Sequence, residues 1–476
     1  MLAKEKRVIT LGVLTLFNVS VMARLRNLPL VAEYGLSCIP YFLLVALIFL
    51  IPCALVSAEL ATGWPKSGGV YIWIREGLGD RWGFFAIWMQ WIHNVSWFPA
   101  ILSFVASTFA LSFFPSLAES KLYTLSTILI LFWGMSYLNY LGVKTSTIIS
   151  SIGVVLGTIL PGIFIIGLSL IWILRGEPLQ ISFTLKALIP DLSSIHNFVF
   201  LTGLFLAFAG LEVSAAYAGE VKNPKRNYPL SIIIAALITF FLFFLGSLSI
   251  SAIIPKEKIS LVSGVMEALR IMLSNYHLAW LIPVLGISLI IGALAETNSW
   301  IMGPIKAMYT TSIHGNLPPI FQKVNKHGMP TSLLLFQAII VSLATCAVMF
   351  TPSLSAAYWI LSALSAQMYL VMYILMFIAA IRLRYTRPHV PRLYQIPHPQ
   401  KGMWIVASVG LFSSTLAFFI AFLPPSQINV GSLYFFEGFL IISLLIMMGI
   451  PLIIHEFRNP KWKLASPLLK DLDPAN

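Results

Sequence analysis

Two arginines stand inside the first long apolar stretch of the chain, where they precede a helix-breaking residue. Arg24 and Arg26 are followed directly by Asn27, Leu28 and Pro29. Arginines within an apolar span cost several kcal/mol unless they face protein, water or a ligand. Proline removes a helical hydrogen bond but suits the first turn of a helix. We therefore predict a broken helix here, with a new segment starting at Asn27 or Leu28.

A second break is predicted near Ala209 and Gly210, in the stretch that also holds Glu212. A helix broken inside a membrane leaves backbone amides free at the start of its second half, and such amides bind carboxylates. We expect the carboxylate of a substrate to bind near residues 27–30 and Gly210. The alternative is that either break is a kink that serves only packing.

Two carboxylates, Glu212 and Glu296, fall deep within apolar stretches. Burial disfavours the charged form of a carboxylate unless it is paired. Each could carry a proton, hold a substrate ammonium group or form a structural ion pair with an arginine. The apolar sequence neighbours of Glu296 favour it as the proton-linked group. Glu212, also a proton-linked candidate, is expected to meet Arg24 or Arg26.

Aromatic residues provide further candidates for substrate binding. Tyr369 and Tyr373 are four residues apart and share a helix face. Each offers an apolar ring and one hydroxyl group, which suits the orientation of a polar solute. Trp300 and Gln90 are candidates of the same kind. Aromatic packing is the alternative for the three aromatic residues.

The sequence does not indicate catalytic, metal or cofactor chemistry. Cys38, Cys53 and Cys346 are far apart and lack the spacing of a metal site or a disulfide framework. Most histidines fall outside the apolar stretches, and we find no nucleophile–base pair within them. We therefore expect neither an enzyme nor a bound metal or cofactor.

The elements that position these residues are long apolar helices. The chain of 476 residues is 58% hydrophobic and 10% charged, with a mean hydropathy of +0.89. Soluble domains carry about a quarter charged residues, whereas about 20 apolar residues cross a bilayer core as a helix. We predict an all-α membrane protein, with one transporter domain over residues 1–476 and twelve transmembrane helices. Their predicted ranges are 8–35, 39–62, 82–114, 121–141, 146–174, 198–219, 228–254, 278–303, 332–350, 355–381, 403–423 and 431–454.

The positive charge of the chain is distributed among loops. The net charge is +13, and a large majority of the 30 Lys and Arg residues fall in one of the two alternating sets of loops. Basic loops remain cytoplasmic, so both termini are expected there, as short tails over residues 1–7 and 455–476. Because no single basic patch forms, we expect the bilayer and not nucleic acid as the partner.

A run after the second span resembles a signature of the amino acid–polyamine–organocation superfamily. The run contains Pro65, Gly68, Gly69 and Tyr71, in the pattern P-x-x-G-G-x-Y. Along nearly its whole length the chain is most similar to the bacterial glutamate/GABA antiporter family within that superfamily. The stretches that carry this similarity are RWGF at 81–84, GLEVSA at 210–215, VKNPKRNYP at 221–229, LAE at 294–296, SWIMGP at 299–304 and FLPP at 422–425.

The resemblance implies a fold and an activity. The fold has twelve helices, of which 1–5 and 6–10 form inverted repeats with helices 1 and 6 broken, followed by helices 11 and 12; paired breaks favour the same architecture. The activity is exchange of an external for an internal amino acid across the bacterial inner membrane. The resemblance places five residues on the transport path, namely Glu212, Glu296, Trp300, Tyr369 and Tyr373.

Two departures from that family affect the interpretation. The family has tyrosines around the first break, where this chain has Arg24, Arg26 and Asn27, which favours an anionic or otherwise differently charged amino acid. Its long inhibitory C-terminal tail is not expected here, since only about twenty residues follow the last predicted helix. A proton–amino acid symporter of the same fold is the main alternative. The sequence leaves open whether the protein is a monomer or a homodimer.

Overall fold

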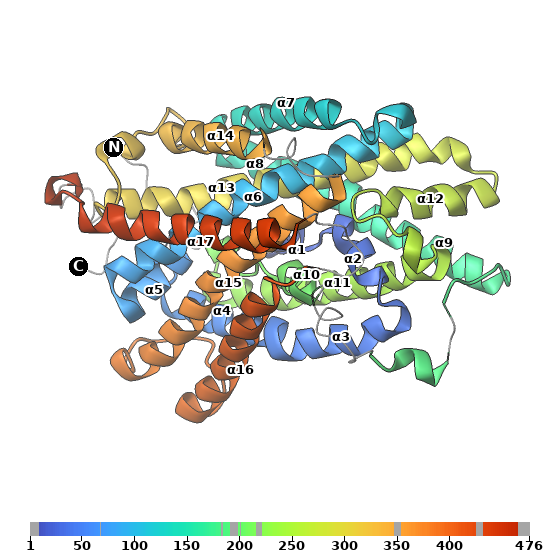
Figure 1. Ribbon diagram of the computed structural model, residues 1–476. Coiled ribbons are helices and arrows are strands. Elements are labelled where there is room, and N and C mark those ends of the chain that lie inside the picture. The colour runs from blue at the N-terminus through green and yellow to red at the C-terminus, as the bar shows by residue number, and fades with distance from the viewer. Residues whose placement is uncertain are drawn as a thin grey trace.

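In the computed structural model every named element of the described residues is a helix. The structure describes residues 9–66, 68–181, 184–190, 199, 201–215, 221–346, 354–424 and 432–464. Figure 1 shows long helices running side by side along one direction. The longer helices and their bounds are α1 Leu11–Met22, α2 Leu28–Ala32, α3 Cys38–Val45, α4 Ile51–Gly63, α5 Val70–Leu78, α6 Asp80–Phe113, α7 Lys121–Tyr140, α8 Val143–Val154, α9 Leu160–Leu174, α10 Leu201–Phe208, α11 Pro224–Ile253, α12 Gly264–Asn275, α13 Ile282–Ile313, α14 Thr331–Thr345, α15 Leu354–Thr386, α16 Pro399–Ile420 and α17 Leu433–Glu456.

The helices have the length and composition of membrane spans. Among the described residues, nine continuous helical stretches are long and apolar enough to cross a bilayer. Two shorter apolar stretches, Leu201–Ala215 and Thr331–Thr345, accompany them. This confirms the all-α membrane class, whereas the count of twelve spans and the inverted repeat remain predictions.

Local sequence signals set several helix starts. The hydroxyl groups of Thr10, Ser120 and Ser432 accept hydrogen bonds from the third amide of α1, α7 and α17 respectively, as serine and threonine do at helix N-caps. Gly79, with a φ of 96°, separates α5 from α6. A left-handed residue at this position favours glycine and lets α6 start directly after α5.

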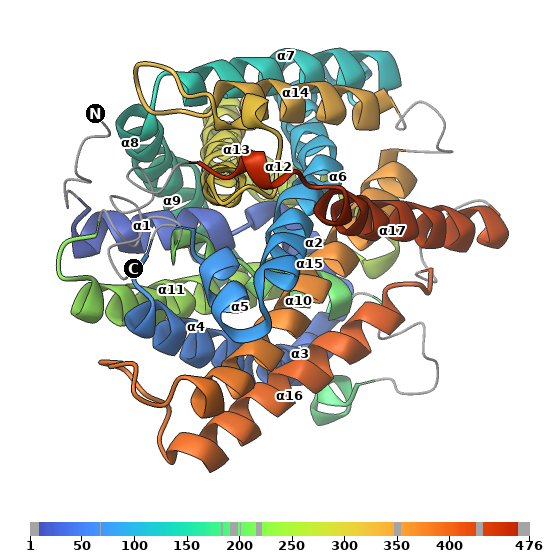
Figure 2. The same cartoon turned by 90° about the vertical axis from the view of Figure 1, so that its left-hand side faces the viewer.

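Three long helices form the centre of the molecule. α6 packs against both α13 and α15, while α1 packs against α11, α8 and α13. Figure 2 shows α6 and α15 near the middle of the bundle, with α7 and α14 on one side and α16 on the other. The two predicted breaks, after α1 and after α10, therefore lie among these central helices.

Two described helices were not predicted. α5 and α12 are shorter than a membrane span and combine one apolar face with charged residues such as Arg75 and Glu267. A search for continuous apolar stretches passes over such amphipathic helices, since their apolar residues recur every three or four positions. The predicted helix 8 was also too short, because α13 continues to Ile313.

Close approach of two glycines fixes the crossing of α13 with the π-helical turn Val155–Ile159. A Cβ atom on Gly157 would lie 2.0 Å from the nitrogen of Gly292, and one on Gly292 would lie 2.2 Å from the oxygen of Gly157. Small residues allow membrane helices to meet this closely. Gly157→Ala should therefore destabilise the protein by about 1–3 kcal/mol, the usual cost of overpacking.

The measurement is the midpoint of thermal unfolding in detergent. Gly134→Ala in α7 is the control, since a Cβ atom there would have no neighbour within 4 Å. Equal midpoints for the two variants would show that the crossing is not packed as described.

A buried polar site at two helix breaks

The first break lies where it was predicted. α1 ends at Met22, residues 25–27 form one 3-10 turn, and α2 begins at Leu28 with Pro29 in its first turn. The amide of Asn27 donates to the oxygen of Arg24 at 2.8 Å, and the amide of Leu28 donates to Leu25. The Leu28 side chain lies against Gly246 of α11, so it packs α2 against that helix.

The second break centres on Gly210. α10 ends at Phe208, and Gly210 has a φ of 120°, which favours glycine. A Cβ atom here would lie 2.7 Å from Cγ1 of Val21 and 3.1 Å from Cζ2 of Trp300. Buried Ala209 precedes it, with its amide bonded to the oxygen of Leu206 at 3.3 Å. The backbone of this break thus lies directly against α1 and α13.

The free amides that the sequence predicted are partly occupied. The Gly210 amide donates to the hydroxyl of Tyr373 at 2.8 Å. Those of Asn27 and Leu28 are bonded within their own turn, and α2 has only five residues. These three amides are therefore not free in this structure, and binding of a carboxylate at the breaks remains a prediction. The cationic groups at the break are instead the two arginine side chains.

Arg24, Arg26 and Glu296 form a buried ion cluster at the first break. Nε of Arg24 lies 2.9 Å from Oε1 of Glu296, and Nη1 of Arg26 lies 3.7 Å from the same oxygen. Each of the three side chains is at most 5% exposed. Nη1 of Arg24 also donates to the oxygen of Leu206 on α10, at 2.6 Å. The cluster thus joins α13 to both breaks.

Two tryptophans enclose the arginines. The Arg24 guanidinium lies 5.5 Å from the ring centre of Trp97 and 5.2 Å from that of Trp300, while Arg26 lies 4.9 Å from Trp97. Cations are attracted to aromatic faces at such distances. Trp300 is itself fixed, because its Nε1 donates to the oxygen of Val21 at 3.1 Å.

Glu212 has neutral partners. Its Oε1 accepts hydrogen bonds from Nε2 of Gln90, at 2.9 Å, and from the hydroxyl of Tyr369, while its Oε2 accepts one from the hydroxyl of Tyr373. The ring of Tyr369 stacks on His93 with centres 4.2 Å apart. Tyr373 joins this group to the second break through Gly210.

These contacts reverse the predicted pairing of the two carboxylates. Glu212 was expected to meet an arginine of the first span, and Glu296 was favoured as the proton-linked group because its sequence neighbours are apolar. In the structure Glu296 has both arginines, because α13 packs against α1 and brings residue 296 beside the break. Distance along the sequence gave no information on this crossing between helices.

Sequence reasoning considered Gln90 together with Trp300, but it did not place His93, Trp97 or Tyr358 at the site. Gln90, His93 and Trp97 lie on one face of α6, at intervals of three and four residues, and Tyr358 donates to Oδ1 of Asn27 at 3.0 Å. Polar residues recurring at that interval within an apolar helix are the signal that identifies a buried polar face. Considered one at a time, these residues do not show that they share a buried polar region.

A small crevice of about 20 Å³ adjoins the arginines. Arg26, Asn27 and Tyr358 line it, together with residues of α10 and α15. That volume is about one water molecule. Nε and Nη1 of buried Arg26 have no hydrogen-bond partner among the described residues. The arrangement can therefore bind an anion that enters beside Arg26 once the crevice widens.

A separate buried carboxylate lies at the end of α4. Glu59 contacts Arg384 of α15 and lies 3.7 Å from Nε of Arg392, and its Oε2 accepts the amide of Ile396 at 2.9 Å. Burial lowers the pKa of Arg392, and the charge of Glu59 opposes this shift. The described residues contain no cluster of three or more His, Cys, Asp or Glu that could hold a metal ion.

Comparison with known proteins gives matches over most of the chain. Residues 9–450 match the model of a family described as amino acid permease. An uncharacterized transporter of Legionella pneumophila is 41% identical, over 94% of this chain and 96% of its own. A glutamate/gamma-aminobutyrate antiporter of Lactococcus lactis is 31% identical, over 96% of this chain and 92% of its own. A probable agmatine/putrescine antiporter of that species is 26% identical over 77% of each chain.

Proposed function

The chain belongs to the amino acid permease family of the amino acid–polyamine–organocation superfamily, and we propose that it is an amino acid antiporter of the glutamate/GABA exchanger type. It works by alternating access, through twelve spans in which two inverted repeats of five helices surround the breaks. It lies in a bacterial inner membrane with both termini in the cytoplasm. Its substrates are amino acids, and it is not an enzyme.

The observation that carries the substrate proposal is the charge of the cluster at the first break. Two buried guanidinium groups share one carboxylate, Glu296, and Arg26 keeps two nitrogens without a hydrogen-bond partner among the described residues. Charge-assisted hydrogen bonds from arginine to carboxylate are among the stronger polar contacts in proteins. We therefore expect the substrate carboxylate to bind beside Arg26 and Asn27 once the crevice there widens.

A polyamine fits this site less well than an amino acid does. The relatives include both a glutamate/gamma-aminobutyrate antiporter and a probable agmatine/putrescine antiporter. The agmatine/putrescine antiporter is less similar to this chain than the glutamate/GABA antiporter is. A polyamine is cationic and carries no carboxylate, so Arg24 and Arg26 would repel it inside a medium of low dielectric constant. The carboxylates of Glu212 and Glu296 already bind side chains of the protein, so neither is free to bind a polyamine ammonium group.

The role of Arg26 can be tested with Arg26→Gln. Loss of a hydrogen bond to a charged group costs about 1.5–3 kcal/mol, which is about 10-fold to 100-fold in affinity. We expect the apparent affinity for glutamate to fall by that factor in proteoliposomes, because the substrate carboxylate loses its partner. Arg270→Gln, at an exposed arginine of α12, should keep the normal affinity. Equal affinities in both variants would remove Arg26 from the site.

Glu212 and Glu296 are both candidates for the proton-linked group, and they differ in the charge of their partners. Glu296 has two cationic partners, whereas the three side chains that bind Glu212 are neutral. An unpaired buried carboxylate takes up a proton more readily than a paired one. Glu212 is therefore our preferred proton-linked residue. The same feature supports the second candidate function, a proton–amino acid symporter.

Glu212→Gln tests this assignment. Glutamine has nearly the same shape and cannot titrate, so we expect exchange to remain measurable while its rate no longer varies between acidic and neutral pH. Initial rates of exchange across that range give the profile. Glu76→Gln on α5 is the control, since its side chain is partly exposed and distant from the breaks. A pH profile in Glu212→Gln that matches the control would exclude Glu212 as the proton-linked group.

The exchange activity itself is tested by a panel of amino acids. Proteoliposomes are loaded with one labelled amino acid, and efflux is started by adding another outside. Acidic amino acids should give the fastest efflux, and putrescine should give none above buffer. Efflux driven by putrescine alone would replace the proposal with polyamine exchange.

A further inference from the structure

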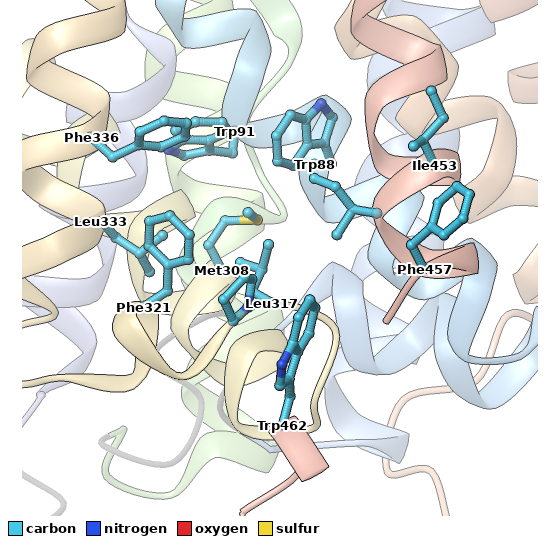
Figure 3. Close-up of a pocket in the computed structure, with 12 residues that line it drawn as sticks. Trp88, Trp91, Met308, Leu317, Phe321, Leu333, Phe336, Ile453, Phe457 and Trp462 are labelled. Carbon is cyan, nitrogen blue, oxygen red and sulfur yellow. The ribbon is translucent and has the colours of Figure 1, made fainter. Parts of the chain in front are cut away.

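An apolar groove opens between four helices at the end of the bundle where α17 ends. Its volume is about 320 Å³, which lies in the range of small-molecule sites. Figure 3 shows the rings of Trp88 and Trp91 from α6 beside Phe336 of α14, with Trp462 from the segment after α17 on the opposite side. Met308 of α13 lies at its base. The lining side chains are all apolar or aromatic, so the groove offers almost nothing to a polar ligand.

The groove opens onto a surface that is itself apolar. Ile453 and Phe457, which line it, are 59% and 79% exposed, and neighbouring Ile320 is 55% exposed. Exposure of this kind on a membrane-spanning helix faces lipid. Tryptophans such as Trp462 are typical of the boundary between hydrocarbon and headgroups. The groove therefore begins at the headgroup level and continues toward the hydrocarbon.

Three exposed lysines are close in sequence to residues that line this end of the groove. Lys461 and Lys463 flank Trp462, and Lys323 follows Phe321 by two residues. The lysine-bearing segments are held together, because Nε2 of Gln322 donates to the oxygen of Trp462 at 2.7 Å. The amide of Leu464 also donates to the oxygen of Ile313, at 3.1 Å. The backbone segments that carry these three lysines, here called the lysine rim, are thus held beside the apolar groove.

We propose that this groove binds one acyl chain of an anionic phospholipid, whose phosphate lies against Lys461, Lys463 and Lys323. The apolar lining suits hydrocarbon, and the lysine rim provides the charge complementary to a phosphate. Basic residues near the membrane surface attract anionic headgroups by about 1 kcal/mol each, which is about fivefold in affinity. The acyl chain of a zwitterionic lipid would make the same apolar contacts in the groove, but its headgroup would gain little attraction from the lysine rim.

Brominated lipids test the proposal, because bromine in an acyl chain quenches nearby tryptophans and three tryptophans line the groove. The full chain is placed in nanodiscs of phosphatidylcholine that contain the same low fraction of either dibromo-phosphatidylglycerol or dibromo-phosphatidylcholine. We expect phosphatidylglycerol to quench more strongly. In Lys461→Gln/Lys463→Gln the difference should disappear, whereas Lys256→Gln/Lys258→Gln, at exposed lysines of another turn, should retain it.

Equal quenching by both lipids in the unaltered chain, or a difference that survives in Lys461→Gln/Lys463→Gln, would overturn the proposal.

The remaining occupant to exclude is the segment that follows Leu464. A variant ending at Leu464 should show unchanged quenching. Stronger quenching in that variant would mean that residues 465–476 fill the groove, and would also overturn it. None of these readings depends on transport, so they stand or fall separately from the proposed exchange.

Discussion

Replacing Glu296 with glutamine is expected to abolish exchange and to destabilise the fold by about 3–5 kcal/mol, the cost of leaving a buried charge without its partner. The carboxylate lies 2.9 Å from Arg24 and 3.7 Å from Arg26, and all three side chains are buried. Glutamine fills the same space but leaves two guanidinium groups facing each other without a compensating anion. The midpoint of thermal unfolding and the yield of monodisperse protein measure the loss.

A double variant separates charge from shape in this cluster. Arg24→Gln/Glu296→Gln removes one cation together with the anion, and should be more stable than Glu296→Gln alone. Exchange should stay absent in it, because Arg24 also joins α1 to α10 through Leu206. If Glu296→Gln unfolded at the same temperature as the unaltered protein, the ion cluster would not contribute as described.

Replacing Glu59 with glutamine is the second change for which a large effect is expected, again about 3–5 kcal/mol. Glu59 contacts Arg384 and Arg392 and receives the amide of Ile396, so it joins α4 to α15 and to the loop before α16. Because it lies apart from both breaks, the variant should lose stability without a change in preference among substrates. Unfolding midpoints and a competition series with unlabelled amino acids give the two readings.

An exposed pair provides the comparison for Glu59. Glu76 lies 3.7 Å from Arg387, with side chains 24% and 56% exposed, and such pairs are worth about 0–1 kcal/mol. Glu76→Gln should therefore change the midpoint little. A changed order of substrate affinities in Glu59→Gln would show instead that this carboxylate acts on the transport path.

Helix breaks were the part of the site that the sequence predicted well. Arg24, Arg26 and Pro29 within one apolar stretch, and Gly210 within another, are local features whose consequences depend on the chain within a few residues. Both breaks therefore lie close to their predicted positions. The hydrogen-bond partner of the Gly210 amide could not be predicted in the same way. It is the hydroxyl of Tyr373, which is far along the chain.

The pairing of charges illustrates the limit of sequence reasoning. Whether Arg24 meets Glu212 or Glu296 depends on how α1 crosses α10 and α13, and the apolar pattern of each helix does not determine that crossing. The same limit explains Gln90 and His93, which are single polar residues in sequence but belong to the Glu212 cluster in space. Amphipathic helices such as α5 were missed for a different reason, since their pattern is periodic and not continuous.

The described conformation is closed around its polar centre. The arginines and both carboxylates are almost fully buried, and the crevice at Arg26 holds about one water molecule. An amino acid needs more space than this, so the proposed binding beside Arg26 requires the crevice to widen.

Counterflow in proteoliposomes is the most direct test of amino acid exchange. Purified protein is reconstituted into vesicles that contain glutamate, GABA or buffer alone, and uptake of labelled glutamate is followed without an imposed ion gradient. An antiporter accumulates label in the loaded vesicles and not in the empty ones, and this is the result that we predict. Equal uptake into empty vesicles once an inward proton gradient is applied would show symport, and absence of uptake into vesicles loaded with either amino acid would contradict exchange of the glutamate/GABA type.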